Sequence, residues 1–244
     1  MIPTYSVLLS PDDSGKLTEC ISGKSVIVKC GEGHFGEDGF WGPRQATLRI
    51  NGIYKLKSCR SVGKAIEVLL EKTIRENKAL SGLLLQKKYR FEENALKIET
   101  LVVNRSENTV PFHFRFHNAP EILRGEGGVY QIGNKKFTRT FNVNLYRFSS
   151  ADKEVDSLIG SGKIHDIPSG AIRFYMENSS IAWQMDFECQ KMQATVFWDS
   201  IKGSSAEIIF KRSLLAPGKS ELFSATLRPV KTAGKSAAEN RKHK

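Results

Sequence analysis

The sequence predicts an all-β protein, built as an antiparallel sandwich or barrel. Short runs of β-branched and aromatic residues recur along the chain. Clusters of Gly, Asn, Ser, Asp and Pro separate these runs at close spacing, as they do between neighbouring antiparallel strands. The length of 244 residues allows a sizeable core, and sandwiches or barrels of this size often form a single unit.

The predicted strands follow one another from residue 24 to residue 229. Turn sequences such as EENA, NRSENT and LAPGKS join them. Many short strands at close spacing are typical of sandwiches and barrels. The strands are expected at residues 24–30, 46–50, 52–59, 82–92, 95–104, 112–117, 128–133, 141–148, 171–176, 194–198, 206–215 and 222–229.

Residues 63–80 support two interpretations. Ile66, Leu69, Leu70 and Ile74 are spaced near the helical period, and a glycine closes the segment, which favours an amphipathic helix. The alternative makes AIEVLLEKTI a strand and RENKAL a turn. Local propensity favours the helix, whereas the surrounding strands favour the strand, which is the structure we expect.

The chain shows no internal repeat and no linker rich in Pro, Gly or Ser. A polar, turn-rich stretch at 149–171 is expected to be a long loop inside one domain. We therefore predict a single β domain at 1–230. The tail at 231–244, KTAGKSAAENRKHK, is basic and poor in apolar residues, so we expect it to be disordered.

The formal net charge of +11 makes nucleic acid a partner to consider. Part of this charge lies in the tail, and the other basic residues are spread along the predicted strands without a dense cluster. We therefore expect a generally basic surface, and a basic nucleic-acid-binding β protein is the distant alternative.

No apolar run approaches the ~20 residues that span a bilayer, so no membrane location is predicted. The opening residues lack the basic region and long apolar core of a signal peptide, which predicts a cytoplasmic protein. The cysteines are widely spaced with no CxxC pair, so no metal site is predicted. We expect buried free thiols, with a Cys20–Cys30 bridge as the alternative.

The run PFHFRFHNAP at 111–120 places two kinds of side chain on opposite faces of one strand. With period two, Phe112, Phe114 and Phe116 share one face. His113, Arg115 and His117 share the other, so the strand is predicted to bury its phenylalanines and to present its polar groups as one wall of a site.

The segment GEGHFGEDGFWGPR at 31–44 is predicted to be a glycine-rich loop. It brings together polar and aromatic side chains suited to a sugar, with Trp41 as a stacking platform and Arg44 or Asp38 bonding hydroxyls. A simple turn with a half-buried Trp is the alternative. The spacing of its acidic residues and His34 matches no metal-ligand signature.

The order of the strands resembles that of a known superfamily. Residues 82–120 join a long strand, a tight turn, a second long strand ending in Val-Asn, a polar turn and an aromatic strand ending in His117. Later, a strand carries Glu207 in SSAEIIF, and an LLAPGKS turn leads into the last strand. This arrangement, over residues 25–230, is similar to the galactose mutarotase-like, or aldose 1-epimerase-like, β-supersandwich.

The resemblance implies an antiparallel β-supersandwich with a sugar site on the concave face of one sheet. In an epimerase, Glu207 would be the base and His117 the acid, with no metal or cofactor. His34 would be a further contact, beside Trp41, Arg44, His113 and Arg115 of the substrate site. The alternative interpretations make Glu207 part of a solvated strand face and His117 a structural partner of a neighbouring strand.

The expected function is recognition of a carbohydrate, either by a stand-alone protein or by an accessory domain of a carbohydrate-active enzyme. An aldose 1-epimerase, an isomerase, is the second hypothesis. The family's usual His-x-Tyr-Phe continuation is absent, because Asn118, Ala119 and Pro120 follow His117. An epimerase requires Glu207 and His117 to converge about a sugar ring apart, whereas a binding domain needs only an aromatic and polar groove.

Overall fold

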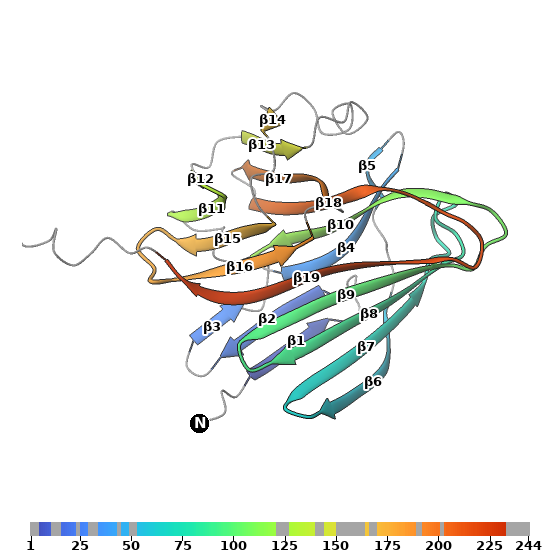
Figure 1. Ribbon diagram of the computed structural model, residues 1–244, viewed down its shortest axis with the longest axis horizontal. Helices are drawn as coiled ribbons and strands as arrows, with labels where there is room; N and C mark the ends of the chain where they lie inside the picture. The colour runs from blue at the N-terminus through green and yellow to red at the C-terminus, as the bar shows by residue number, and fades with distance from the viewer. Residues whose placement is uncertain are drawn as a thin grey trace, which may run out of the picture.

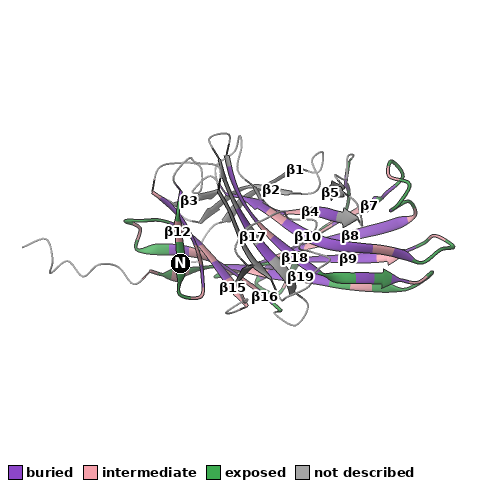
Figure 2. Ribbon diagram, turned by 90° about the horizontal axis from the view of Figure 1, so that it is seen from above, coloured by how far each residue is buried: buried purple, intermediate pink, exposed green. Residues whose placement is uncertain are grey.

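The structure is a computed structural model that describes residues 5–10, 16–22, 25–28, 34–42, 45–48, 53–120, 127–139, 144–149, 164–165, 170–188, 192–200 and 203–232. Its described elements are all strands, and they form two large sheets that pack face to face (Figure 1, Figure 2). The all-β prediction is therefore confirmed. Within these ranges no helix is long and apolar enough to cross a membrane.

The ten-stranded sheet has the order β1-β2-β4-β10-β18-β17-β13-β14, with β3 beside β2 and β5 beside β4. Its neighbouring strands are antiparallel, except for the parallel pair β13 and β14. The strands are β1 (Tyr5–Ser10), β2 (Lys16–Ser22), β3 (Ser25–Val28), β4 (His34–Gly42), β5 (Gln45–Leu48), β10 (Val110–Ala119), β13 (Asn144–Ser149), β14 (Ile164–His165), β17 (Met192–Ser200) and β18 (Gly203–Leu215).

The nine-stranded sheet has the order β12-β11-β15-β16-β19-β9-β8-β7-β6 and is antiparallel throughout. The last strand of the chain therefore lies in the middle of this sheet (Figure 1). The strands are β6 (Lys55–Val62), β7 (Ala65–Thr73), β8 (Leu83–Glu92), β9 (Ala95–Asn104), β11 (Gly128–Ile132), β12 (Lys135–Thr138), β15 (Ala171–Met176), β16 (Ile181–Phe187) and β19 (Ser220–Lys231).

The core lies between the two sheets and is rich in phenylalanine. Alternate residues of β10 point the same way, so Phe112, Phe114 and Phe116 all face the second sheet and are almost fully buried. The ring of Phe114 stacks on that of Phe223 from β19, with centroids 4.4 Å apart. Burying each such ring stabilises the fold by roughly 1.5–3 kcal/mol. The predicted direction of the phenylalanines is confirmed.

The prediction of a loop at 31–44 is wrong for residues 34–42, which form β4 beside β10. The alternation of this strand is visible in its burial, since Asp38 and Phe40 face the core and Glu37 is partly exposed. Its glycines serve close packing. Gly36 has a φ of 63°, and a Cβ there would lie 2.9 Å from the side chain of Ile98.

The expected strand at 65–74 is present as β7, and the helical interpretation of this segment is wrong. β7 pairs with β6 on one side and β8 on the other. These two ladders satisfy its backbone and override the local helix propensity. Two further strands, β1 and β2, lie within residues 5–22, where the sequence predicted none.

Two sequence predictions fall at the limits of the described residues, and a third, on the thiols, is tested at Cys59. The loop at 149–171 is described only in part, and the tail lies outside the described residues from 233 onward. The thiol of Cys59 is free but exposed, so the prediction of a buried thiol is wrong there. Cys59 lies on β6, the edge strand of its sheet, where a neighbouring strand covers only one side.

Candidate functional site

Strand β10 lies between β4 and β18 in the ten-stranded sheet. The register places His117 directly opposite Glu37 of β4 and opposite Glu207 of β18. Directly paired residues point to the same face, with Cβ atoms ~4.5–5.5 Å apart. His117 alternates with the buried phenylalanines, so these three side chains gather on the outer face, meaning the face turned away from the second sheet.

Glu37, His117 and Glu207, here named the His117 cluster, are in direct contact. Nδ1 of His117 lies 3.1 Å from Oε2 of Glu37, and Nε2 lies 3.7 Å from Oε1 of Glu207. Their side chains are 25%, 20% and 15% exposed for Glu37, His117 and Glu207 respectively. A ligand on the outer face can therefore reach all three, while the surrounding sheet restricts their movement.

Arg115 orients the carboxylate of Glu207. Its guanidinium donates from Nη1 to Oε2 of Glu207 in a close ion pair. The side chain runs across Gly39 of β4, where an added Cβ would lie 2.9 Å from Cγ of Arg115. Glycine at position 39 thus leaves the space that the arginine needs. Its Nε is buried and has no hydrogen-bond partner within the described residues.

His113 is buried more deeply than the cluster, with 4% exposure. Its Nδ1 lies 3.1 Å from the backbone oxygen of Phe210 on β18. Nε2 is buried and, in the part of the chain that the structure describes, has no hydrogen-bond partner. The imidazole therefore bridges two strands at a bulge between His113 and Arg115, and the assignment of His113 to a sugar site stays a prediction.

The remaining predicted contacts lie on or beyond β4. The backbone of His34 pairs with Ala119, and that of Trp41 pairs with His113. Both residues thus lie on β4, the strand that carries Glu37 of the His117 cluster. Arg44 lies outside the described residues. The assignment of His34, Trp41 and Arg44 to a sugar site stays a prediction.

A buried ion pair stands behind the cluster, between the two sheets. Nζ of Lys87, from β8, lies 2.7 Å from Oδ1 of Asp38, and it also donates to the backbone oxygen of Gly36. The carboxylate of Asp38 accepts further hydrogen bonds from Tyr54 Oη at 2.6 Å and Thr100 Oγ1 at 3.0 Å. This network fixes β4 from the side opposite to Glu37.

Burial governs the protonation of the partners of Asp38. It raises the pKa of Tyr54 well above its usual value, and the charge of Asp38 raises it further, so the phenol stays a neutral donor. Burial also lowers the pKa of Lys87, an effect that Asp38 opposes. Both groups serve to hold the carboxylate in place.

The sequence predicts no role for Glu37 or Lys87, and it places Asp38 in a different one. The prediction that Asp38 bonds sugar hydroxyls is wrong, because its side chain is only 2% exposed and is bound by Lys87, Tyr54 and Thr100 between the sheets. The sequence offers no clear strand signal at 34–42, because the inward position 38 carries a charged residue and the glycines favour a turn. The alternation, with Glu37 outward and Asp38 and Phe40 inward, is visible only in the structure.

The cluster is suited to proton transfer, because an imidazole both accepts and donates a proton near neutral pH and a carboxylate is a proton acceptor. The expected separation of about a sugar ring is wrong, since Nε2 and the carboxylate are in contact range at 3.7 Å. Register pairing on adjacent strands dictates this closeness. Among the described residues, no three His, Cys, Asp or Glu side chains form a metal-binding group.

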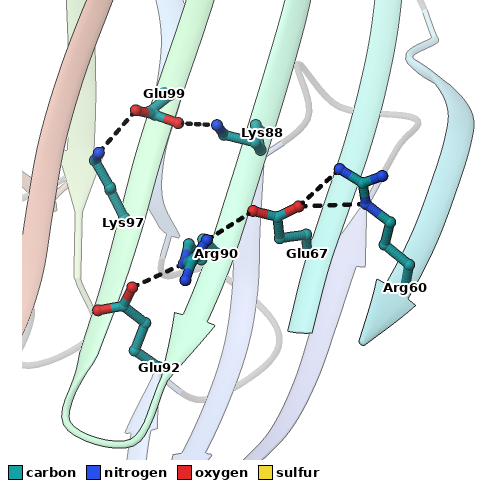
Figure 3. Close-up of polar contacts among 7 residues, drawn as sticks. All are labelled: Arg60, Glu67, Lys88, Arg90, Glu92, Lys97 and Glu99. Carbon is teal, nitrogen blue, oxygen red and sulfur yellow. Dashed lines mark hydrogen bonds and ion pairs between the residues drawn. The ribbon is translucent and has the colours of Figure 1, made fainter. Parts of the chain in front are cut away.

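The outer face of the nine-stranded sheet carries charges of both signs (Figure 3). Glu67 pairs with Arg60 at 3.1 Å and with Arg90 at 3.0 Å, which link β6, β7 and β8. Further pairs join Arg90 to Glu92, and Glu99 to Lys88 and Lys97. Basic and acidic residues therefore alternate on these strands, unlike the continuous basic stripe that binds a nucleic-acid backbone.

No protein-family model matches the chain, and no curated protein matches it in sequence. Solved structures do match its fold. A galactose mutarotase-like protein from Clostridium acetobutylicum superposes with a TM-score of 0.62 at 14% identity, covering 93% of this chain and 92% of that one. A galactose mutarotase-like protein from Lactobacillus casei superposes with a TM-score of 0.62 at 11% identity, covering 93% and 97%.

A third similar structure is a larger protein. A TPR-domain containing protein from Parabacteroides distasonis matches with a TM-score of 0.62 at 11% identity, over 93% of this chain but only 46% of that one. At such identities the similarity concerns the fold alone. The sheets, their order and these structures together show that the chain has the galactose mutarotase-like, or aldose 1-epimerase-like, β-supersandwich fold.

Proposed function

We propose that this protein binds an aldose at the His117 cluster and interconverts its two anomers. The observation that carries the proposal is the convergence of His117 and Glu207, whose reactive atoms lie 3.7 Å apart on a partly exposed sheet face. The reaction requires a general acid and a general base that reach two oxygens bonded to the same carbon.

Ring opening needs two proton transfers, at the two oxygens that are bonded to the anomeric carbon. Glu207 takes the proton of the anomeric hydroxyl while His117 gives a proton to the ring oxygen. The bond between the anomeric carbon and the ring oxygen breaks, and the hydroxyl oxygen becomes a carbonyl oxygen. Rotation about the neighbouring carbon–carbon bond exposes the other carbonyl face, and ring closure with reversed transfers gives the other anomer.

At 3.7 Å the two groups lie closer than the sugar-ring separation expected of an epimerase, but a short distance is compatible with transfers at two oxygens of one carbon. The anomeric hydroxyl and the ring oxygen are bonded to the same carbon, so the acid and the base act on neighbouring atoms. Arg115 orients the Glu207 carboxylate, because its Nη1 donates to Oε2 of that group. The carboxylate of Glu207 is therefore already oriented before a sugar binds.

Carbohydrate binding without catalysis is the second candidate. The favouring observation is that this fold makes up about half of the larger protein from Parabacteroides distasonis, as 46% of that chain is matched. In such a role the outer face of β4, β10 and β18 would recognise a sugar for a catalytic partner, and proton transfer by His117 would not be needed.

The test is the rate of anomer exchange. Freshly dissolved α-glucose and α-galactose are followed by polarimetry and by ¹H NMR exchange spectroscopy with the wild-type protein. Replacing either His117 by Asn or Glu207 by Gln should lower the rate by ~10²- to 10⁴-fold, because each change removes one proton-transfer partner. Glu107→Gln, an exposed residue of the β9–β10 turn, is the matched control and should keep the wild-type rate.

Binding is measured in the same samples to separate the two candidates. Backbone chemical-shift changes at residues 37, 117 and 207, with anomer exchange at the buffer rate, would favour the binding domain. If a panel of aldoses produces no rate enhancement and no chemical-shift changes, both candidates are contradicted.

A further inference from the structure

We propose that Glu37 is a positioning residue for His117, holding the imidazole in its Nδ1–H tautomer so that Nε2 is the atom that exchanges a proton. The inference rests on the proposed function, because the sugar is the group that Nε2 would serve. It assigns to Glu37 a role that neither the sequence nor the similar folds suggested.

The two imidazole nitrogens have different surroundings. Nδ1 lies 3.1 Å from Oε2 of Glu37, within hydrogen-bond range, whereas Nε2 lies 3.7 Å from Oε1 of Glu207. An ionised carboxylate only accepts hydrogen bonds, so a hydrogen bond across this distance requires the proton on Nδ1. Nε2 then holds the lone pair of the neutral ring, or the second proton of the charged ring, on the side of the proposed base.

The residues on both sides of Glu37 are held in place by hydrogen bonds. The amide of Gly36 donates to Oδ1 of Asn118 at 2.8 Å, and the oxygen of Gly36 accepts from Nζ of Lys87. On the other side, the Asp38 carboxylate is bound by Lys87 and two hydroxyl donors. A supported strand of this kind holds a side chain in one working geometry.

An ordinary cross-strand ion pair would give the same distance but a different behaviour. Exposed pairs of this type contribute little and leave the tautomer of the ring to solvent. Glu37 is only 25% exposed and His117 20%, so competition from water is limited. The tautomer of His117 therefore distinguishes positioning from a merely structural contact.

The decisive measurement is the long-range ¹H–¹⁵N spectrum of the histidine rings in the full-length, ¹⁵N-labelled protein. The His117 signals are assigned by their loss in His117→Asn. In the wild type, at a pH where the ring is neutral, we expect a protonated Nδ1 and an unprotonated Nε2. In Glu37→Gln the ring should redistribute toward the Nε2–H tautomer, while Glu107→Gln should match the wild type.

A second measurement is the rate of anomer exchange catalysed by the same variants. Outer-shell groups that orient a metal-bound imidazole typically contribute ~10- to 100-fold. We expect a similar factor for Glu37, so Glu37→Gln should lower kcat by ~10- to 100-fold with little change in KM. Thermal unfolding establishes that each variant is folded. If Glu37→Gln does not fold, Glu37→Asp, which keeps the charge on a shorter side chain, should give an intermediate tautomer ratio.

The two proposals fail separately. An unchanged tautomer in a folded Glu37→Gln protein overturns the positioning role, whatever the activity of the wild type. A full kcat in this variant overturns it as well. A changed tautomer in a protein without any anomer exchange supports the positioning of His117 by Glu37 and contradicts the proposed epimerase function.

Discussion

Replacing Lys87 by Met should destabilise the protein strongly, because it removes one partner of a fully buried ion pair. The Lys87 and Asp38 side chains are both 0% exposed and their charged atoms are 2.7 Å apart. Without the ammonium, the Asp38 carboxylate keeps two hydroxyl donors but loses its counter-charge, and the Gly36 oxygen loses a donor. Removing one member of such a pair costs about 3–5 kcal/mol.

The assay is reversible unfolding in urea and by heat. For a protein of this size each kcal/mol shifts Tm by ~2–4 °C, so Lys87→Met should lower Tm by roughly 6–20 °C. Lys64→Met, in the exposed β6–β7 turn, is the matched control and should stay within about 0.5 kcal/mol of the wild type.

A double-mutant cycle tests whether the cost arises from the pair. Asp38→Asn removes the second charge and keeps one acceptor oxygen, although Tyr54 and Thr100 donate to different oxygens of the carboxylate. The double variant should lose less free energy of unfolding than the two single variants lose together, by roughly 0.5–3 kcal/mol. Additive losses, or a Lys87→Met protein as stable as the control, would refute the reasoning. Since the pair lies behind Glu37, the single variant should also loosen the His117 cluster.

Three further changes test other parts of the structure. A methyl group at Gly39 would lie 2.9 Å from Cγ of Arg115, so Gly39→Ala should displace the arginine from Glu207. The change should cost about 1–3 kcal/mol of stability and slow anomer exchange. An unaltered rate and Tm would contradict this packing. Hydrogen bonds from Arg60 and Arg90 lower the pKa of Glu67 below 4.5, so its stabilising contribution is present above that pH and is lost as the pH falls through the folded pKa. Glu67→Gln should therefore flatten the acid side of the Tm–pH curve, and a curve identical to the wild type would contradict the pairing. Phe114→Ala, which empties a fully buried site against Phe223, should cost about 3–5 kcal/mol in urea unfolding, and a loss under about 1 kcal/mol would contradict the inter-sheet core.

The alternation of side chains along single strands was enough to predict much of the fold. Residues 112–117 carry a period-two pattern, and the structure has them in β10. The same pattern predicted that Phe112, Phe114 and Phe116 face the core and that His117 faces away from it. Such predictions succeed because the period of a strand is a local property.

Which strands lie side by side could not be read from these patterns. The contact between Glu37 and His117 joins residues 80 positions apart, and the register of β4 with β10 decides it. For the same reason the helix or strand state of 65–74 depended on β6 and β8, whose ladders pair with it. A local propensity carries no information about such partners.

The sequence by itself determined the all-β class, the two faces of β10 and the resemblance that selected His117 and Glu207. Only the tertiary structure decided that 34–42 is a strand, because the need for glycine at positions 36 and 39 comes from Ile98 and Arg115 on other strands. It also decided that Lys87, one of many basic residues in the sequence, is buried. A charge is stable in the core only beside its counter-charge, and Asp38 reaches it only when the two sheets pack together.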